Sequence, residues 1–393
     1  MYGVGELFGV NVKVLCFSSQ YLPGYKGGGP IKTIKNLFDQ ACPVLDFWLV
    51  TSDRDLGDKE PYSSINCGEW NVVGNAWVYY VQAGRRGFLQ IANILKNDAY
   101  DIVYLNSFFS IRFSFFPLLL AKLLKRRVVL GPRGEFSKGA LEIKLLKKKI
   151  FIRLFKLFRF HRGVVFQASS EFEEADIRTV LGESVDIRVA EDIGTQEFIR
   201  EFPVRSANML EAVFVSRISP KKNLLAALEM IHNVGKPLRY DIFGPIEDRD
   251  YWAQCEEKIA SLPSHVQVEY KGELNPDQII NTMAKYDVFL MPTKGENYGH
   301  VVAEALCAGL PLLIADTTPW RHLQELGIGW DLPLSNPGAF SSVLDELATM
   351  SRDEHRRMRE TVLVWAKKKF AQKDAIDANI EMFRYAYEKK GNL

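Results

Sequence analysis

The sequence has few cysteines, almost no excess of charge and no long apolar run. Its five cysteines, Cys16, Cys42, Cys67, Cys255 and Cys307, lie far apart and form no CxxC pair. This spacing argues against a disulfide framework or a zinc site, and it predicts a reducing, cytoplasmic location. The net charge of +2 over 393 residues gives no overall field that would attract nucleic acid. We therefore expect no nucleic-acid partner.

Membrane-spanning and secreted classes are disfavoured by the same kind of absence. The longest apolar run without a charge, residues 113–121, is about half of the roughly 20 residues that a spanning helix needs. The first residues lack a basic start followed by an apolar core, so we expect no secretory signal. The apolar share of 47% and the charged share of 25% are ordinary for a soluble globular protein.

Charge is unevenly distributed along the chain. Residues 122–162 contain 14 Lys or Arg against two Glu, and within them residues 144–162 alternate basic with Ile, Leu and Phe side chains. This pattern predicts a basic amphipathic helix on an anionic membrane surface, with the Phe-rich run 108–124 helping to receive a lipid tail. A core-packing helix with a lysine-rich outer face is the alternative. The predicted membrane-surface residues are Lys147, Lys148, Lys149, Arg153, Lys156 and Arg159.

The remaining apolar segments alternate with helical ones in two series. The first series of predicted strands is 11–18, 46–52, 76–82, 101–107, 127–133 and 163–169, and the second is 211–217, 239–244, 266–272, 286–292 and 310–316. Apolar strands separated by helices indicate parallel sheets covered on both faces. We predict an α/β protein with doubly wound domains at residues 1–195 and 210–375, a linker at 196–209, and a last helix at 376–393.

Charged residues stand where strands of the second domain end, the edge at which such sheets bind ligands. Arg217 and Lys222 follow one strand, and two cations there suit a diphosphate, although they equally describe a solvated surface pair. A helix that begins near Gly299 would offer free N–H groups to an anion. Glu304, inside that helix, suits the vicinal hydroxyls of a ribose, and Glu296 suits those of a second ring. This alternation of sugar and phosphate is that of a nucleotide sugar.

These motifs together resemble those of family 4 glycosyltransferases. Glu296 and Glu304, with "NYG" and "EALCAGLPL" after them, are similar to the family's E-x7-E motif, and "SRISPKKN" places Arg217 and Lys222 in register with another family element. "GGGP" resembles its N-terminal glycine loop, and "DIFGPIEDRDYW" and "VEYKGEL" fall where the base is usually held. The resemblance extends over residues 11–370. Donor-binding positions carried over from it are Gly28, Gly29, Arg217, Lys222, Gly244, Tyr270, Asn297, Tyr298, Gly299, His300 and Glu304.

The resemblance implies a GT-B fold, two Rossmann-like domains facing a cleft. The C-terminal domain would hold the nucleotide sugar and the N-terminal domain the acceptor, with the last helix returning to the N-terminal domain. It also implies a retaining reaction without metal or cofactor, and the sequence agrees in having no His/Cys cluster. Two Asp-Arg-Asp triplets, 53–55 and 248–250, lie in charged stretches that we interpret as surface.

Catalysis would then rest on stabilising the departing diphosphate. The resemblance assigns this role to Arg217, Lys222, the Gly299 helix end and the amides of Gly28 and Gly29. The acceptor hydroxyl would attack from the same face, and a phosphate oxygen would take its proton. Glu296 would position the sugar, with a role as nucleophile as the lesser alternative.

Several positions depart from the family pattern. Arg133 stands where the family often has a histidine near the donor sugar; it is able to donate hydrogen bonds to a hydroxyl or the diphosphate but not to exchange protons. Asn223 replaces a glycine after the lysine, and residues 188–194 replace a Pro-Asn-Gly turn. His300 fits either a donor contact or a surface residue, and Trp320 fits either the core or a ligand contact.

The sequence thus predicts a retaining, metal-independent hexosyltransferase that is peripheral at the cytosolic face of the membrane. Its donor would be a UDP-sugar, or next a GDP-sugar, and its acceptor a glycan or glycolipid at the inner membrane. A polyprenyl-diphosphate-linked saccharide of lipopolysaccharide or capsule assembly fits best. The alternatives are a GT-B enzyme with a soluble acceptor, a nucleotide-sugar epimerase and a non-catalytic donor-binding subunit. A dinucleotide dehydrogenase is disfavoured because "GGGP" lacks the G-x-G-x-x-G spacing.

Overall fold

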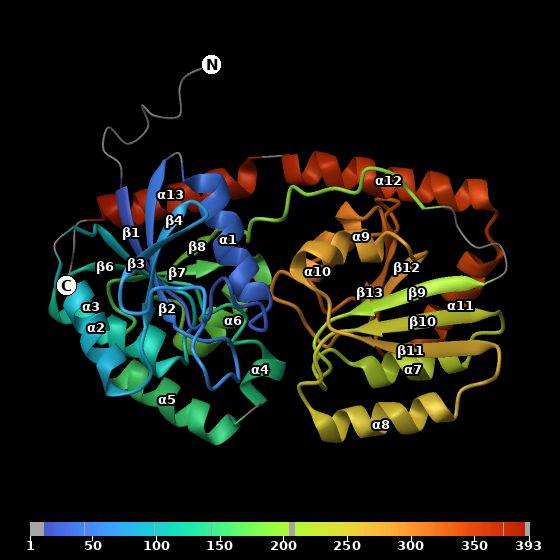
Figure 1. Cartoon of the computed structure of the whole chain (residues 1–393), viewed down its shortest axis with the longest axis horizontal. Helices are drawn as coiled ribbons and strands as arrows, with labels where there is room; N and C mark the ends of the chain where they lie inside the picture. The colour runs from blue at the N-terminus through green and yellow to red at the C-terminus, as the bar shows by residue number, and fades with distance from the viewer. Residues whose placement is uncertain are drawn as a thin grey trace, which may run out of the picture. The chain divides into compact units, whose positions relative to one another are not determined.

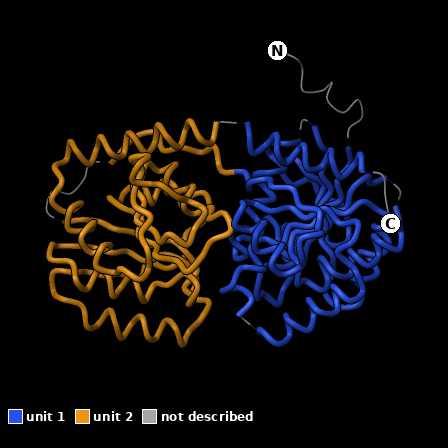
Figure 2. Tube along the Cα trace, turned by 180° about the vertical axis from the view of Figure 1, so that it is seen from behind, with its two compact units in different colours: residues 1–193, 373–393 blue, residues 194–372 orange. Residues whose placement is uncertain are grey.

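The computed structural model describes residues 12–42, 44–97, 99–142, 144–203, 209–371 and 373–389. The chain divides into two compact units (Figures 1 and 2). Unit 1 comprises Met1–Ile193 and Lys373–Leu393, and unit 2 comprises Gly194–Gln372. The sequence analysis had placed the corresponding boundaries at residues 195 and 375. The last helix, α13 (Asp374–Glu388), therefore belongs to the same unit as the start of the chain.

Unit 1 is built on an eight-stranded sheet in the order β3-β4-β2-β1-β5-β6-β7-β8. All neighbouring pairs are parallel except β3 with β4. The central strands are almost wholly buried because helices cover both faces. The strands are β1 (Val12–Phe17), β2 (Leu45–Ser52), β3 (Trp70–Val73), β4 (Ala76–Val81), β5 (Ile102–Leu105), β6 (Arg127–Leu130), β7 (Val164–Ala168) and β8 (Asp186–Val189).

Alternate residues of the unit 1 strands enter two separate apolar cores. Val14 of β1 packs with helices α1 (Gly29–Ala41) and α13, whereas Leu15 packs with the helices on the opposite face. Those helices are α2 (Arg85–Leu95), α3 (Phe116–Leu123), α5 (Leu145–Leu157) and α6 (Glu171–Leu181), with a π-helical turn at Ile111–Phe115 and the short α4 (Lys138–Glu142) between them (Figure 1). This alternation is the two-residue period of a strand buried on both faces.

Unit 2 has a six-stranded parallel sheet in the order β11-β10-β9-β12-β13-β14. Its strands are β9 (Leu210–Val215), β10 (Leu238–Phe243), β11 (Val266–Gly272), β12 (Val288–Met291), β13 (Leu312–Ala315) and β14 (Gly329–Leu332). Its helices are α7 (Leu224–His232), α8 (Arg249–Ala260), α9 (Ile279–Met283), α10 (His300–Cys307), α11 (Pro337–Thr349) and α12 (Arg352–Ala371), with a 3-10 turn at Pro276–Gln278. Both units are thus doubly wound α/β domains, as the sequence predicted.

The sequence analysis missed the strands at three sheet edges. β3, β8 and β14 are four residues long and partly exposed, so none of them shows a fully apolar run. The predicted linker also differs, since Ile199 N donates to Cys307 O at 3.1 Å and the Phe202 ring lies under Arg359. Its first part therefore packs on unit 2, while residues 204–208 lie outside the described residues.

The predicted lipid-receiving run 108–124 is largely interior. Phe108 and Phe113 are buried in the core, and Phe115 packs edge-on against Phe151 of α5 with ring centroids 5.3 Å apart. Phe108 and Phe115 thus pack on α5 from the segment before α3 and are not a surface for a lipid tail, whereas Ile111 and Leu123 of the same run are 55% and 71% exposed. Among the described helices, none has both the length and the apolar character that crossing a membrane requires.

Candidate functional site

The loops after β9 and β12 of unit 2 are joined by a buried ion pair. Lys222 Nζ lies 2.6 Å from Glu296 Oε1, and the two side chains are only 12% and 9% exposed. Thr293 Oγ1 lies 3.1 Å from the same carboxylate oxygen, and Lys294 N donates to Lys221 O at 2.9 Å. Two segments about 70 residues apart in sequence thus form one rigid strand-end surface.

The charge of Glu296 is maintained by its partner. Burial alone would raise the pKa of Glu296, but Lys222, together with Lys221 and the Thr293 hydroxyl, outweighs burial, and the pKa lies below its usual value. The carboxylate is therefore ionised at neutral pH and acts as a hydrogen-bond acceptor. This suits the predicted role of binding sugar hydroxyls.

Helix α10 begins beside this pair. Gly299 caps it with φ 82°, a left-handed conformation that favours glycine, and His300 is its first residue. The first-turn N–H groups of α10 and the positive end of its helix dipole therefore lie next to the loop that carries Glu296. Glu304 lies one turn further in and is 6% exposed. The structure therefore brings Lys222, Glu296 and the α10 N-terminus together, as the sequence predicted for a nucleotide-sugar site.

An aromatic cluster supports the loop from within. Trp320 Nε1 donates to Tyr298 O at 2.6 Å, and the Tyr298 ring packs against Trp320 and His300 with centroids 5.5 and 4.8 Å apart. Tyr298 is 4% exposed and Trp320 7%. Both rings therefore act in packing, and of the two interpretations of Trp320 the core one holds. Asn297, between the glutamate and the buried tyrosine, is partly exposed.

Arg217 is not joined to this cluster by any contact among the described residues. Its Nη1 lies 2.9 Å from Glu247 Oε1, and the two side chains are 41% and 46% exposed. An ion pair this exposed is weak. Because this pair is weak, the Arg217 guanidinium can bind another anion in place of Glu247 at little cost in free energy. Its contact with a diphosphate stays a prediction.

The backbone conformation explains the residue type at Gly244 and at Asn223, where the family has glycine. Gly244 has φ 132°, and a Cβ there would lie 2.0 Å from Ser216 O, so no side chain fits between β9 and β10. Tyr270 Oη donates to Gly244 O at 2.9 Å and fixes the same turn. Asn223 caps α7 with φ 62°. This is a left-handed position, which asparagine tolerates better than most residues, and so the departure from glycine is accommodated.

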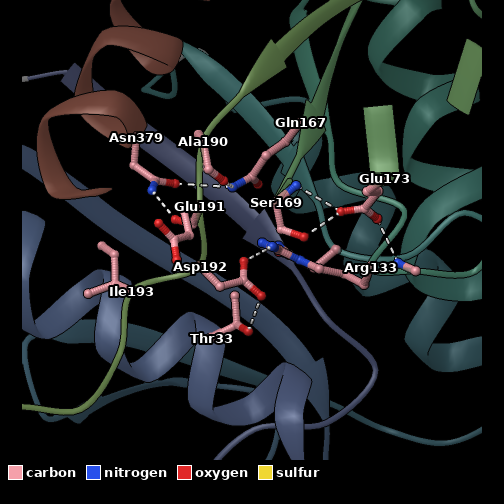
Figure 3. A network of polar contacts seen from close by, with 12 residues as sticks. Thr33, Arg133, Gln167, Ser169, Glu173, Ala190, Glu191, Asp192, Ile193 and Asn379 are labelled. Atoms are coloured by element: carbon pink, nitrogen blue, oxygen red, sulfur yellow. Dashed lines mark hydrogen bonds and ion pairs between the residues drawn. The ribbon is translucent and has the colours of Figure 1, made fainter. Parts of the chain in front are cut away.

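Unit 1 has a polar network at the corresponding edge of its own sheet (Figure 3). Arg133, beyond the end of β6, donates from Nη2 to Asn106 Oδ1 at 2.7 Å and to Tyr104 Oη, and its Nη1 pairs with Asp192 Oδ1. Asp192 Oδ2 accepts from Thr33 of α1 at 2.9 Å. The Arg133 side chain is 7% exposed. It is therefore bound within unit 1, a different placement from the predicted one facing a donor sugar.

The two departures from the family pattern in unit 1 explain each other. Asp192 lies in the segment that replaces the Pro-Asn-Gly turn, and it is the counterion of the arginine that replaces the histidine. Burial alone would lower the pKa of Arg133, but Asp192, with Tyr104 and Glu173, outweighs burial and the pKa is raised, so the guanidinium stays charged. The sequence gives no link between the two departures, because Arg133 and Asp192 are 59 positions apart.

The rest of the network ties the last helix to the sheet (Figure 3). Asn379 of α13 donates to Glu191 O at 2.8 Å, and Gln167 of β7 donates to Asn379 Oδ1 at 3.1 Å. Glu173 accepts from Ser169 N at 2.8 Å and from Gly134 N at 2.6 Å. Burial raises the pKa of Glu173. The loops after β6, β7 and β8 are thus tied to one another and to α13 by hydrogen bonds.

The glycine loop before α1 uses most of its own amides. Gly28 N donates to Tyr25 O at 3.0 Å, Ile31 N donates to Gly28 O at 3.1 Å, and Pro30 has no N–H. The predicted diphosphate contact of the Gly28 amide is therefore disfavoured, because that hydrogen is already bound. The amide of Gly29 keeps the outward position of a first-turn N–H.

Of the two Asp-Arg-Asp triplets, only the second lies at the surface, as the sequence suggested. Asp53 and Asp55 are 3% and 6% exposed, whereas Asp250 is exposed and Asp248 caps α8 by accepting from Tyr251 N at 3.0 Å. The interpretation as surface is thus wrong for Asp53, which pairs with Arg54, and for Asp55, which accepts from the Tyr25 and Lys26 amides. Within the described ranges no group of three or more His, Cys, Asp or Glu side chains is arranged to hold a metal ion.

Helix α5 exposes an apolar and basic face. Phe155 is its buried contact, while Leu146, Ile150 and Leu157 are 72%, 53% and 68% exposed. Lys147, Lys149, Arg153 and Arg159 are exposed on the same helix and its end. Phe155 in the core and the exposed lysines match the alternative of a core-packing helix with a lysine-rich outer face, and the exposed leucines add apolar surface to that face.

Two of the predicted membrane-surface lysines are engaged elsewhere. Lys148 is partly buried, donates to Ala140 O at 2.7 Å and lies 4.9 Å from the centre of the Phe109 ring. Burial lowers its pKa. Lys156 donates to Val180 O at 3.1 Å. Lys148 is thus an inward-facing residue of α5 and not a membrane contact.

Comparison with known proteins agrees with this geometry. Residues 195–362 match the model of the family described as "Glycosyl transferases group 1". HepE of Anabaena, solved with UDP and glucose, has a TM-score of 0.69 at 14% identity, over 95% of this chain and 99% of its own. WaaG, a glycosyltransferase involved in lipopolysaccharide biosynthesis, has a TM-score of 0.67 at 15% identity, over 94% and 99%.

A curated relative matches over a shorter stretch. Sulfoquinovosyl transferase SQD2 of Arabidopsis thaliana is 28% identical over 151 residues, which are 37% of this chain and 27% of that protein. The chain thus matches about a quarter of the length of this relative. The two units together have the GT-B fold of glycosyltransferases, and unit 2, which holds the Lys222–Glu296 pair, carries the match to glycosyl transferases group 1.

Proposed function

We propose that the protein is a retaining, metal-independent glycosyltransferase of the family 4 type that uses a nucleotide diphosphate sugar, with UDP as the favoured nucleotide. The observation that carries this is the buried Lys222–Glu296 pair, 2.6 Å long, beside the start of α10. It combines an ionised acceptor for sugar hydroxyls with a helix end for phosphate. HepE, of similar fold, was solved with UDP-glucose, which supports the choice of nucleotide.

The proposed reaction needs no protein nucleophile. The bond from the anomeric carbon to the diphosphate breaks, and the acceptor hydroxyl forms the new bond on the same face. Its proton passes to a phosphate oxygen, and the nucleoside diphosphate leaves. Lys222, the amides at the start of α10 and Arg217 stabilise the negative charge that develops on the diphosphate. Glu296 positions the sugar, and Glu304 binds the ribose hydroxyls.

The proposed acceptor is a membrane-associated saccharide, with a polyprenyl diphosphate as carrier. The support is the outer face of α5, where Leu146, Ile150 and Leu157 alternate with Lys149 and Arg153. Apolar side chains between exposed cations suit an anionic bilayer surface. WaaG, of similar fold, takes part in lipopolysaccharide biosynthesis. The protein would then work as a peripheral enzyme at the cytosolic side of the membrane.

A thermal-shift panel with UDP, GDP, ADP, CMP and NAD tests the donor site. We expect UDP to stabilise the wild type, by about 2.7 kcal/mol at 100 times its Kd. The variant Glu304→Gln, nearly isosteric and inside α10, should lose most of this shift. The control Glu256→Gln, exposed on α8, should keep it.

The other outcomes of the panel separate the alternatives. A shift by NAD alone would overturn the transferase. A shift by UDP with no sugar transfer to any acceptor would indicate a donor-binding subunit without catalysis. If UDP stabilises Glu304→Gln as much as the wild type, Glu304 does not bind the ribose.

A further inference from the structure

Helix α10, whose first turn belongs to the proposed donor site of unit 2, is short and depends on what holds its ends. It has eight residues, and a helix of this length is not stable alone in water. At its C-terminal end Gly309 takes φ 63°, Gly309 N donates to Leu306 O at 2.9 Å and Leu310 N donates to Ala305 O at 2.9 Å. This is the Schellman arrangement of a helix end. It leaves the carbonyls of Ala308 and Gly309 to be bound by other groups.

Arg359 of α12 binds these two carbonyls. Its Nε donates to Gly309 O at 3.1 Å, and its Nη2 donates to Ala308 O at 3.2 Å. The same Nη2 donates to Ala284 O at 2.8 Å, at the end of α9. One guanidinium therefore caps the carboxyl ends of two helices, where the negative ends of the helix dipoles favour a cation.

The guanidinium of Arg359 is enclosed by the protein. Arg359 is 4% exposed, and its guanidinium lies 4.6 Å from the centre of the Phe202 ring. The same ring packs beside Gly309, where a Cβ would lie 2.5 Å from a ring carbon. Burial lowers the pKa of Arg359 to about 10, against the opposing effect of Asp287, so the side chain is still charged at neutral pH. A buried charge needs hydrogen-bonded partners, and the three helix carbonyls supply them.

A second contact of α12 holds the strand that leads to the same site. His355, one turn before Arg359, has its Nε2 at 3.0 Å from Asp287 O, directly before β12. The other end of β12 leads into the loop that carries Glu296. Helix α12 thus binds the first residues of β12 and the last residues of α10, and the opposite ends of these two elements form the Glu296 loop and the start of α10.

We propose that Arg359 is a positioning residue of the donor site: it binds the carboxyl ends of α9 and α10 and thereby keeps the start of α10 in place for the nucleotide. This inference rests on the proposed function, in which the first-turn amides of α10 and Glu304 bind the donor. Arg359 lies at the other end of the helix from these groups and acts through the helix. All of the contacts involved lie within unit 2.

Hydrogen–deuterium exchange on the full chain tests whether Arg359 holds α10. Arg359→Met keeps an unbranched apolar side chain but removes every donor, and we expect faster exchange in peptides that cover residues 300–310. The matched control is Leu344→Ala, which removes a fully buried side chain from α11, a helix that packs on α7 and β9. This control should lower the melting temperature while exchange in residues 300–310 stays at the wild-type rate. Wild-type exchange there in Arg359→Met would overturn the inference.

The affinity for UDP, or for the nucleotide that the thermal-shift panel selects, tests the effect on the site. It is measured by calorimetry at a temperature at which circular dichroism shows each variant to be folded. We expect Arg359→Met to raise the Kd about threefold to tenfold, because groups that are loose before binding must be ordered on binding. Leu344→Ala should keep the wild-type Kd. If both variants lose affinity in parallel with their melting temperatures, Arg359 is a structural residue and the inference is wrong.

A second variant covers the case in which Arg359→Met does not fold. Arg359→Lys keeps the positive charge but lacks the planar fork that reaches several carbonyls at once. We expect its exchange in residues 300–310 to be faster than in the wild type, and exchange at the wild-type rate would overturn the inference.

The nucleotide measurements separate this inference from the proposed function. If no nucleotide of the panel binds the wild type, the proposed function fails and this inference fails with it. If a nucleotide binds the wild type and Arg359→Met with equal Kd, only the positioning role is overturned.

Discussion

The carboxyl edges of the two sheets are built in opposite ways. At the edge of unit 2, the site comes from two short stretches, 217–223 and 293–304, joined by the Lys222–Glu296 pair. At the edge of unit 1, six segments of the chain each contribute a residue to one buried network. These residues are Asn106 and, labelled in Figure 3, Thr33, Arg133, Gln167, Asp192 and Asn379; Tyr104 joins Arg133 to Gln167.

The two edges also differ in how their arginines are paired. Arg133 and Asp192 are 7% and 3% exposed, whereas Arg217 and Glu247 are 41% and 46% exposed. A buried pair is expensive to break, because the remaining charge stays in a region of low dielectric. An exposed pair is exchanged easily. The arginine of unit 1 therefore holds its loops together, whereas the arginine of unit 2 is in an exposed pair that is easily broken.

The largest expected effect comes from breaking one pair in each unit. Asp192→Ala should lower the free energy of unfolding by about 3–5 kcal/mol, because it leaves the Arg133 guanidinium buried without a counterion. Glu247→Gln should lower it by less than about 1 kcal/mol. Urea unfolding followed by circular dichroism measures both. Equal losses would contradict the contrast between the two edges.

The second comparison removes positive charge from α5 of unit 1 or from α12 of unit 2 and measures binding to membranes. Replacing Lys147, Lys149 and Arg153 of α5 with Gln should weaken binding to vesicles with anionic lipid by about 3 kcal/mol, at about 1 kcal/mol for each charge. The matched control replaces Arg357, Lys367 and Lys368 of α12 in unit 2, which are also exposed. Sedimentation with vesicles measures the difference. If both triple variants lose binding equally, α5 is not a specific membrane contact.

The third comparison concerns the pair in unit 2. In Lys222→Gln we expect at least about a tenfold loss of transfer rate, since a hydrogen bond to a charged group contributes about 1.5–3 kcal/mol. The wild-type pKa of Glu296 is lowered, so its stabilising contribution is present at neutral pH and is lost only as pH falls through that lowered pKa.

The pH profile shows whether Lys222 is responsible. Without Lys222, burial dominates and raises the pKa of Glu296 above its usual range. The variant should therefore lose its residual activity as pH falls from about 7 to about 5, whereas the wild type should keep its activity over that range. Parallel profiles for both proteins would show that another group sets the charge of Glu296.

Much of the fold was predictable because it is encoded locally. Among the described residues, the ten central strands were predicted from their largely apolar runs, since a strand buried on both faces has an apolar sequence, and the partly exposed edge strand β11 was predicted as well. The three missed strands, β3, β8 and β14, lie at sheet edges and are partly exposed. Their sequences therefore lack the pattern on which the prediction relied.

The cluster at the strand ends of unit 2 was predictable from the strand pattern. Lys222 and Glu296 are 74 positions apart in sequence, but they follow β9 and β12, which are neighbours in the sheet, and Gly299 and Glu304 follow in the next short helix. The sequence by itself thus determined the two doubly wound domains and the strand-end cluster of unit 2. It also determined the basic and apolar character of α5.

Only the tertiary structure decided the placements that depend on distant segments. Asp192 pairs with Arg133 across 59 positions, and Asp55 meets the amide of Tyr25 across 30. The tertiary structure also directs Lys148 inward and places Tyr298 among aromatic rings. From sequence alone, a charged residue is predicted to be exposed unless its partner is known. Burial of a charge is decided by which distant groups reach it, because only a paired and hydrogen-bonded charge is tolerated inside a protein.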